Sequence, residues 1–185
     1  NSIIMELFYG QFMKKMTCLY CNKSIRSFDP FVTLNLNLNN SKNYCTIDSL
    51  INNYFKTEII DLYCNCQGGN SRFIDDTSII KLPNILMISI NRFKINNGYY
   101  SKDYTEIDLD YSLDLSNYSD ILIIDSVEYT LSSMICHIGD ANSGHYYSII
   151  NKNDKWFCFN DHVITDFDIN KLDKKSPYIL FYSRK

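Results

Sequence analysis

Ser143-Gly144-His145-Tyr146-Tyr147-Ser148, followed by Lys155-Trp156-Phe157-Cys158-Phe159-Asn160-Asp161, decides how this chain folds. Both stretches are rich in aromatic residues, which favours strands over residues 145–151 and 155–160. The few residues between them leave room only for a tight turn, so the two strands form an antiparallel hairpin. Further strands along the chain are joined by loops rather than helical crossovers. The sequence therefore predicts an α+β fold with a mainly antiparallel sheet.

The hairpin has two registers that fit its length. A turn at Lys152-Asn153 places His145 directly opposite Asn160, whereas a turn at Asn153-Asp154 makes Asn160 its diagonal neighbour. Both registers put the two side chains on one face. Because side chains alternate along a strand, Asp161 would point to the other face. We therefore expect Asn160, not Asp161, to be the partner of His145.

A histidine with a carboxamide partner suits the chemistry of a cysteine peptidase. The imidazole presents one nitrogen to a thiol, while an acceptor holds the other nitrogen in a fixed tautomer. The alternative is a histidine that is merely satisfied beside a polar loop, and short motifs often have that explanation. The other histidines carry less: His137 is expected to pack or hydrogen-bond locally, and His162 has no assigned role.

Other elements follow from apolar spacing and from turn residues. Helices are expected at residues 3–12, begun by Ser2, and through residue 55 after a cap at Thr46. The latter helix would bury Ile47, Leu50, Ile51 and Tyr54. Strands are expected at residues 31–38, 85–90, 129–138 and 178–183, with a break at Pro83 and a short helix at 169–172.

Composition limits the function classes. The 185 residues are 45% apolar with a formal charge of −3, which favours one compact unit and argues against the basic surface that nucleic acids require. We expect no membrane association, since no apolar run approaches spanning length and no signal peptide is visible. An intracellular location, cytoplasmic or nuclear, follows as an expectation. Because the first residue is Asn1 rather than methionine, we expect a fragment of a longer protein.

The cysteines favour metal ligation over disulfides. Seven are present, an odd number, and two close pairs stand out, Cys18 with Cys21 and Cys64 with Cys66. Such pairs can supply the four ligands of a structural zinc ion, although the second pair has a tight spacing. Free thiols that hold no metal are the alternative. Cys45 and Cys136 are expected to be buried or incidental thiols.

Cys158 is the thiol that alternation places on the face of His145 and Asn160. It lies within a strand between Phe157 and Phe159, without the helix N-terminus or the cations that lower the pKa of a thiol. We therefore do not expect Cys158 to be a nucleophile.

Five blocks, in order along the chain, resemble the ubiquitin-specific protease family of deubiquitinating cysteine peptidases. They are residues 2–10 with Cys18-Leu19-Tyr20-Cys21 and Phe28-Asp29-Pro30-Phe31, residues 49–58, Leu82-Pro83-Asn84-Ile85-Leu86-Met87-Ile88-Ser89-Ile90-Asn91-Arg92-Phe93-Lys94, residues 129–146, and residues 156–161 with Tyr178-Ile179-Leu180-Phe181-Tyr182. The resemblance runs nearly end to end. It implies one partial catalytic domain, residues 1–185, with a papain-like cysteine proteinase fold. Zinc-bearing fingers would cover about residues 13–80 and a palm with the histidine box about 81–185, with the thumb largely missing.

The resemblance also implies a function. The parent protein would cleave the bond after the C-terminal glycine of ubiquitin, with His145 as general base and Asn160 as its orienting partner. Gly144 and Tyr146 would contact the substrate, and the loops at 94–105 and 139–143 would flank the channel for the tail of ubiquitin. In the family the nucleophile lies in an Asn-Thr-Cys-Tyr block, which this sequence lacks. We therefore expect the thiol to come from a missing segment and this chain alone to be inactive.

Two other functions stay open at this stage. One is a catalytically inactive module of the same fold that binds ubiquitin or acts as a scaffold. The other is a zinc-stabilised interaction domain without affinity for ubiquitin. Hydrolysis separates the first from the enzyme, and a binding titration with ubiquitin separates the second.

Overall fold

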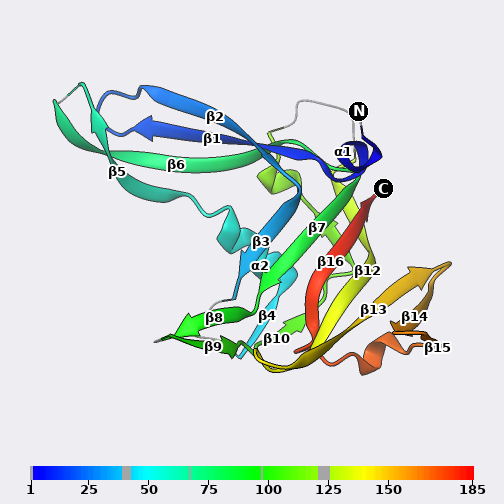
Figure 1. Ribbon diagram of the computed structural model, residues 1–185. Helices are drawn as coiled ribbons and strands as arrows, with labels where there is room; N and C mark the ends of the chain where they lie inside the picture. The colour runs from blue at the N-terminus through cyan, green and yellow to red at the C-terminus, as the bar shows by residue number, and fades with distance from the viewer. Residues whose placement is uncertain (1, 39–42, 67, 97, 121–125) are drawn as a thin grey trace.

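A computed structural model describes residues 2–38, 43–66, 68–96, 98–120 and 126–185, and its larger sheet runs through the centre of Figure 1. The neighbouring strands of this sheet are, in order, β15 (Val163–Asp166), β14 (Lys155–Asn160), β13 (Gly144–Lys152), β12 (Glu128–Gly139), β16 (Pro177–Arg184), β7 (Ile85–Asn91) and β3 (Thr33–Asn37), and β11 (Ser112–Asp114) also pairs with β12. The pairings are antiparallel except that of β3 with β7. The expected α+β architecture with a mainly antiparallel sheet is confirmed.

A smaller antiparallel sheet projects from the larger one as a long blade, at the upper left of Figure 1. Its strands, in order, are β2 (Ser24–Phe31), β1 (Gly10–Cys18), β6 (Gly69–Lys81) and β5 (Glu58–Cys64). Two short ribbons complete the fold: β4 (Tyr44–Thr46) lies parallel to β10 (Glu106–Asp108), and β8 (Phe93–Asn96) forms an antiparallel hairpin with β9 (Tyr99–Lys102).

The helices are short. In α1 (Ile3–Phe8) the Ser2 hydroxyl accepts a hydrogen bond from the amide of Ile4, as expected from its capping position. The expectation that this helix continues to residue 12 is wrong, because Gly10 already begins β1. Packing explains the early end: the ring of Phe12 stacks on that of Phe31 with centroids 4.0 Å apart, across the β1–β2 pair.

Helix α2 (Ile47–Tyr54) begins with a capping box formed by Thr46 and Ser49. Its buried residues are Ile47, Leu50 and Ile51. Tyr54, which was expected on the same buried stripe, is 39% exposed at the last position of the helix. The other helical segments among the described residues are the 3-10 turns η1 (Ser116–Tyr118) and η2 (Ile169–Lys171), so the short helix expected at 169–172 is a single turn.

The core lies against the larger sheet. Alternate residues of β3 and β7, among them Leu34 and Ile88, are fully buried. Two tyrosines are buried with them and remain hydrogen-bonded: the Tyr129 hydroxyl donates to the carbonyl of Pro83 at 2.6 Å, and that of Tyr182 donates to the carbonyl of Asp110 at 2.8 Å. Buried hydroxyls that find such partners fix the register of the strands around them.

One strand prediction needs correction, and some strands and pairings were not predicted. The strand expected at residues 31–38 is divided, because Phe31 ends β2, Val32 is 40% exposed, and β3 begins at Thr33. Strand β15 was not predicted, since its four residues are all exposed and give no apolar alternation. The parallel pairs β3–β7 and β4–β10 were not predicted either, because they join segments far apart in the sequence.

Within the described residues, no helix is long and apolar enough to cross a membrane.

Candidate active site

The hairpin of β13 and β14 adopts the second of the two expected registers. Lys152 pairs with Lys155, so the turn consists of Asn153 and Asp154. Both turn residues have positive φ, 53° and 62°, which is the conformation of a type I′ turn. Asparagine and aspartate tolerate this left-handed region better than most residues. His145 and Asn160 are therefore diagonal neighbours on the two strands.

The structure brings His145 and Asn160 into contact, with His145 Nε2 and Asn160 Oδ1 2.5 Å apart. Asn160 is the last residue of β14 and pairs with Val163 of β15. Asp161 lies in the intervening turn with φ of 52°, away from the strand geometry that would aim it at the imidazole. Because a carboxamide oxygen can only accept, Nε2 carries the proton and Nδ1 is left as a proton acceptor.

The turn between β12 and β13 precedes His145 directly. Gly139 pairs with Gly144 across this turn and has a φ of 103°, which favours glycine. Asp140 Oδ1 accepts hydrogen bonds from the amides of Asn142 and Ser143 at 2.8 and 2.9 Å. These amide donors hold the pKa of the Asp140 carboxyl below its ordinary value. The loop predicted beside the site is thus an ordered turn.

Gly144 lies against the ring of His137. A Cβ placed on Gly144 would be 2.1 Å from His137 Nε2 and 2.6 Å from the carbonyl oxygen of Ile138. His137 is only 4% exposed, and its Nδ1 has no hydrogen-bond partner among the described atoms. Burial, followed by the charge of Lys102, lowers the pKa of its imidazole. His137 packs locally, in agreement with the expectation for it.

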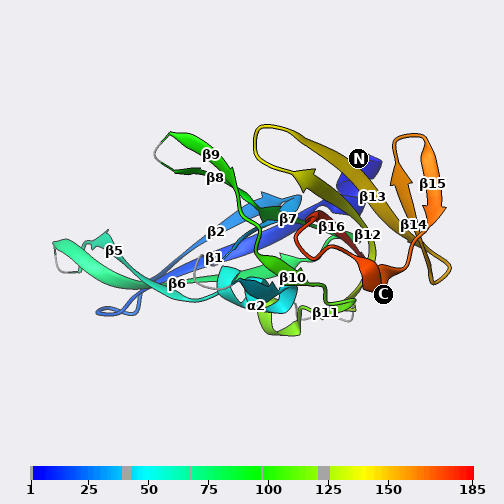
Figure 2. The same cartoon turned by 90° about the horizontal axis from the view of Figure 1, so that it is seen from below.

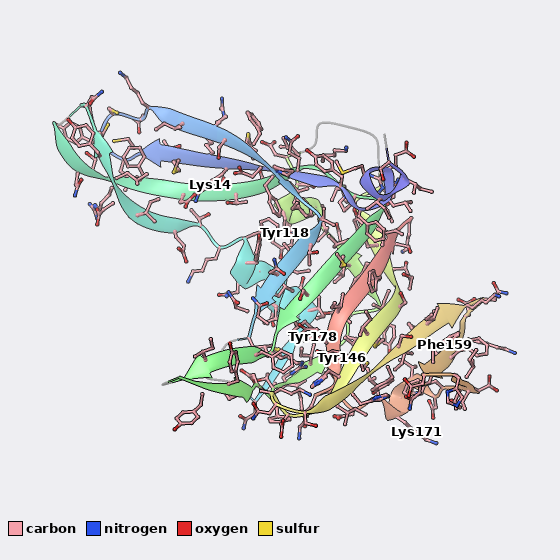
Figure 3. The ribbon with its side chains drawn as sticks, in the orientation of Figure 1. Lys14, Tyr118, Tyr146, Phe159, Lys171 and Tyr178 are labelled. Atoms are coloured by element: carbon pink, nitrogen blue, oxygen red, sulfur yellow. The ribbon has the colours of Figure 1, made fainter. Side chains whose placement is uncertain are left out.

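Aromatic rings gather around Tyr146, the residue that follows His145 in β13. The ring of Tyr146, which is 50% exposed, lies 4.6 Å from that of His137 and 5.8 Å from that of Tyr178. Figure 3 shows the side chains of Tyr146 and Tyr178 together at the lower end of the larger sheet. Phe93 completes the group, 5.4 Å from the ring of His137 and 5.6 Å from that of Tyr178. Together these rings form a largely apolar cluster, with the tyrosine hydroxyls and the imidazole nitrogens as its polar groups.

Arg92 is a structural residue that the sequence reasoning did not single out. It is fully buried, and Nε donates to the carbonyl of Pro177 at 2.7 Å. Nη1 donates at 2.9 Å to the carbonyls of Asp103 and of Thr105. Desolvation lowers the pKa of its guanidinium. A charged residue two positions after the buried strand at 85–90 was the signal that could have found it.

Among the described residues, no cysteine is hydrogen-bonded to His145. Cys158 pairs with Ile149, three residues along β13 from Tyr146, and burial raises the pKa of its thiol. Burial likewise raises the pKa of Cys45, and that of Cys136 to about 11. These thiols have the character of packed side chains.

The predicted cysteine pairs meet at the far end of the smaller sheet. The sulfur atoms of Cys18, Cys21, Cys64 and Cys66 all lie within 4.8 Å of one another. Backbone hydrogen bonds, first from Cys21, lower the pKa of Cys18 to about 6, which favours the thiolate that binds metal. The cluster could hold a metal ion.

The spacing of the sulfur atoms tests that possibility. Four sulfurs about 2.3 Å from a zinc ion form a tetrahedron with edges of about 3.8 Å. The Cys18–Cys66 and Cys21–Cys64 distances, 3.9 and 3.8 Å, match such edges. The Cys64–Cys66 distance of 3.0 Å is shorter, so these two side chains would have to separate slightly. With that adjustment, the donor set fits a zinc ion.

Comparisons with known proteins agree over the whole chain. The sequence model of the family described as ubiquitin carboxyl-terminal hydrolase matches residues 1–182. The chain is 27% identical over its full length to ubiquitin carboxyl-terminal hydrolase Usp2 of Drosophila melanogaster and 29% identical to probable ubiquitin carboxyl-terminal hydrolase 4 of Schizosaccharomyces pombe. It spans only 20% and 33% of the lengths of these two relatives.

Solved structures share the fold. The chain superimposes along its full length on a chain of the SAGA Ubp8/Sgf11/Sus1/Sgf73 DUB module bound to ubiquitin aldehyde, with a TM-score of 0.89 and 24% identity, and covers 43% of that chain. A structure of the module bound to monoubiquitin gives a TM-score of 0.88 at 25% identity, with 42% of that chain covered. At the lower identity, the likeness speaks for the fold alone.

Proposed function

The chain belongs to the ubiquitin carboxyl-terminal hydrolase family, and from that premise we propose that it carries the general base and the orienting residue of a thiol-dependent deubiquitinase. The parent protein would cleave the bond after the C-terminal glycine of ubiquitin. His145 is the general base and Asn160 orients its ring. The single observation that supports this assignment is the 2.5 Å contact between His145 Nε2 and Asn160 Oδ1.

The contact supports the following path for the proton. With Nε2–H donated to Asn160, Nδ1 of His145 takes the proton of a thiol, and the thiolate attacks the glycine carbonyl carbon. His145 then gives that proton to the leaving amine as the C–N bond breaks. Water, deprotonated by the same imidazole, hydrolyses the resulting thioester and restores the thiol. The nucleophilic cysteine belongs to a segment outside this chain.

The same proposal covers the substrate contacts and the domain parts. Gly144 and Tyr146 are the proposed contacts for the diglycine end of a ubiquitin tail, and Tyr146 offers it a ring that is 50% exposed. Residues 94–105 and 139–143 flank this tail; Asn97 lies outside the described residues. The fingers, at about 13–80, include most of the blade, and residues from about 81 to 185 form the palm. Ubiquitin or ubiquitinated proteins are the partners.

Zinc at Cys18, Cys21, Cys64 and Cys66 would be structural. A zinc ion with four thiolate ligands has no open position for a substrate, so it would serve the fold by tying the end of β1 to the end of β5. Metal analysis of the purified protein tests this part, and a protein that folds with far less than one equivalent of zinc would contradict it.

Hydrolysis of a ubiquitin C-terminal amide by the full-length protein tests the catalytic assignment. We expect His145→Gln to lower kcat by roughly 10²–10⁴, the usual contribution of a general base, and Asn160→Ala to lower it less. His162→Gln is the matched control. His162 lies only two residues from Asn160 but has no assigned role, so its substitution should leave kcat unchanged. A His145→Gln enzyme with the kcat of the natural protein would refute the assignment.

A second function is a catalytically inactive module that binds ubiquitin. The absence of a hydrogen bond between His145 and any described thiol favours it for the chain by itself. A titration of this chain with ubiquitin should then show binding without turnover. Turnover by the chain that is abolished by Cys158→Ser would show that Cys158 is the nucleophile after all. Full-length protein that binds ubiquitin and does not hydrolyse its amide would establish the inactive module.

A further inference from the structure

Lys102 is a buried lysine at the end of β9, with only 9% of its surface exposed. Its Nζ donates to the carbonyl oxygen of His137 at 2.8 Å and to that of Gly139 at 3.1 Å. The Tyr104 hydroxyl also donates to the Gly139 carbonyl, at 3.4 Å. The ammonium group therefore ties the β8–β9 hairpin to the end of β12.

The two carbonyl groups flank the residue that pairs with His145. Ile138 lies between His137 and Gly139 and is the cross-strand partner of His145. Gly139 pairs with Gly144, where the turn into β13 closes. Figures 1 and 2 both place the β8–β9 hairpin beside this turn. A donor that holds these carbonyls fixes the end of β12, the strand with which His145 is paired.

A buried ammonium group needs a reason to stay buried. Desolvation, followed by the nearby charge of Arg92, lowers the pKa of Lys102. Its hydrogen bonds in the described part of the chain go to main-chain carbonyls rather than to a carboxylate. Charge-assisted hydrogen bonds of this kind are stronger and more directional than neutral ones. Their loss would remove the Lys102 donor from the His137 carbonyl and would leave the Gly139 carbonyl with the longer 3.4 Å bond from Tyr104.

We propose that Lys102 is a positioning residue for His145, which it holds in register with Asn160 by clamping the carbonyls of His137 and Gly139. The proposal rests on the proposed function, in which the contact between His145 and Asn160 sets the tautomer of the imidazole. Lys102 does not touch the reacting atoms and acts only through the turn.

The His145 Nε2–H proton reports this position directly. In the NMR spectrum of the ¹⁵N-labelled chain, a hydrogen bond to Asn160 should slow its exchange enough for a downfield resonance to appear, and Asn160→Ala should remove that resonance and so assign it. We expect Lys102→Met to remove it or to speed its exchange roughly tenfold or more, because the turn loses both donor bonds. Lys102→Arg keeps donors for both carbonyls and should retain the resonance.

Each outcome decides a separate point. Circular dichroism first shows whether each variant is folded, and Lys171→Met, a substitution of a lysine in η2 whose side chain is 81% exposed, is the matched control that should change nothing. A folded Lys102→Met chain with the resonance unchanged would overturn the clamp. No resonance in the natural chain would instead overturn the His145–Asn160 geometry, and with it the proposed function. If Lys102→Met does not fold, Lys102→Arg decides: a folded chain with the resonance supports the clamp, and any other result overturns it.

Discussion

Gly144→Ala should destabilise the chain through a steric conflict. The new Cβ would lie 2.1 Å from His137 Nε2, 2.6 Å from His137 Cε1 and 2.6 Å from the carbonyl oxygen of Ile138. Real Cβ atoms do not come that close. The ring of His137 is held between those of Phe93 and Tyr146, and the Ile138 carbonyl is part of a paired strand, so neither can move freely. No backbone strain is involved, since Gly144 is outside the positive-φ residues.

Overpacking of this kind costs about 1–3 kcal/mol of the free energy of unfolding. For a chain of this size, each kcal/mol lowers the thermal midpoint by about 2–4 °C, so we expect a loss of roughly 2–12 °C. Urea denaturation should show a lower midpoint with an unchanged slope. Gly69→Ala is the control, because its Cβ would meet no atom within 4 Å and should change the free energy by less than about 0.5 kcal/mol.

A double-mutant cycle identifies the cause. His137→Ala removes the ring from the conflict, so Gly144→Ala should cost less in that background than in the natural chain. The Ile138 carbonyl remains, so the rescue should be partial. A Gly144→Ala chain as stable as the natural one, or an equal loss in both backgrounds, would refute the reasoning.

Three further changes test other contacts. Tyr129→Phe should lower the free energy of unfolding by about 1–3 kcal/mol, because the buried Pro83 carbonyl loses its 2.6 Å donor; an unchanged urea midpoint would count against this. The lowered pKa of Asp140 means that its carboxylate stabilises the turn at neutral pH and loses that effect as the pH falls through the folded-state value. The Ser143 amide should then lose protection from hydrogen exchange in acid, whereas protection that persists would contradict the prediction. Cys66→Ser should lower both zinc content and thermal midpoint, and a variant that binds zinc as tightly as the natural chain would show that Cys66 is not a ligand.

Much of the fold could be predicted because the local patterns agree with the tertiary structure. Thr46 predicted the start of α2, and the apolar run at 85–90 predicted the buried strand β7. Alternation placed Asn160 rather than Asp161 on the face of His145, and the structure has the side chains of Asn160 and His145 in contact. Sequence left the hairpin register open because both turns satisfied parity, and the positive φ of Asn153 and Asp154 decided between them.

Other features depend on contacts that no local pattern encodes. The end of α1 at Phe8 follows from the stacking of Phe12 on a ring of the neighbouring strand. The bonds of Lys102 to the turn before His145 join segments 35 and 37 residues apart. Long-range contacts of this kind override local signals. The apolar spacing at residues 3–12 favoured a longer helix, and a lysine such as Lys102 is normally expected at the surface.

Because Arg92 donates to main-chain carbonyls, its hydrogen bonds should depend less on pH and salt concentration than ion pairs do. Surface ion pairs, such as that of Lys185 with Glu128, weaken when the carboxylate takes up a proton or when dissolved ions screen the charges. A main-chain carbonyl has no proton to gain in ordinary acid, and the buried guanidinium is shielded from dissolved ions. We therefore expect the segments that meet around Arg92 to remain hydrogen-bonded at low pH and at high salt concentration, under conditions in which the surface ion pairs are broken.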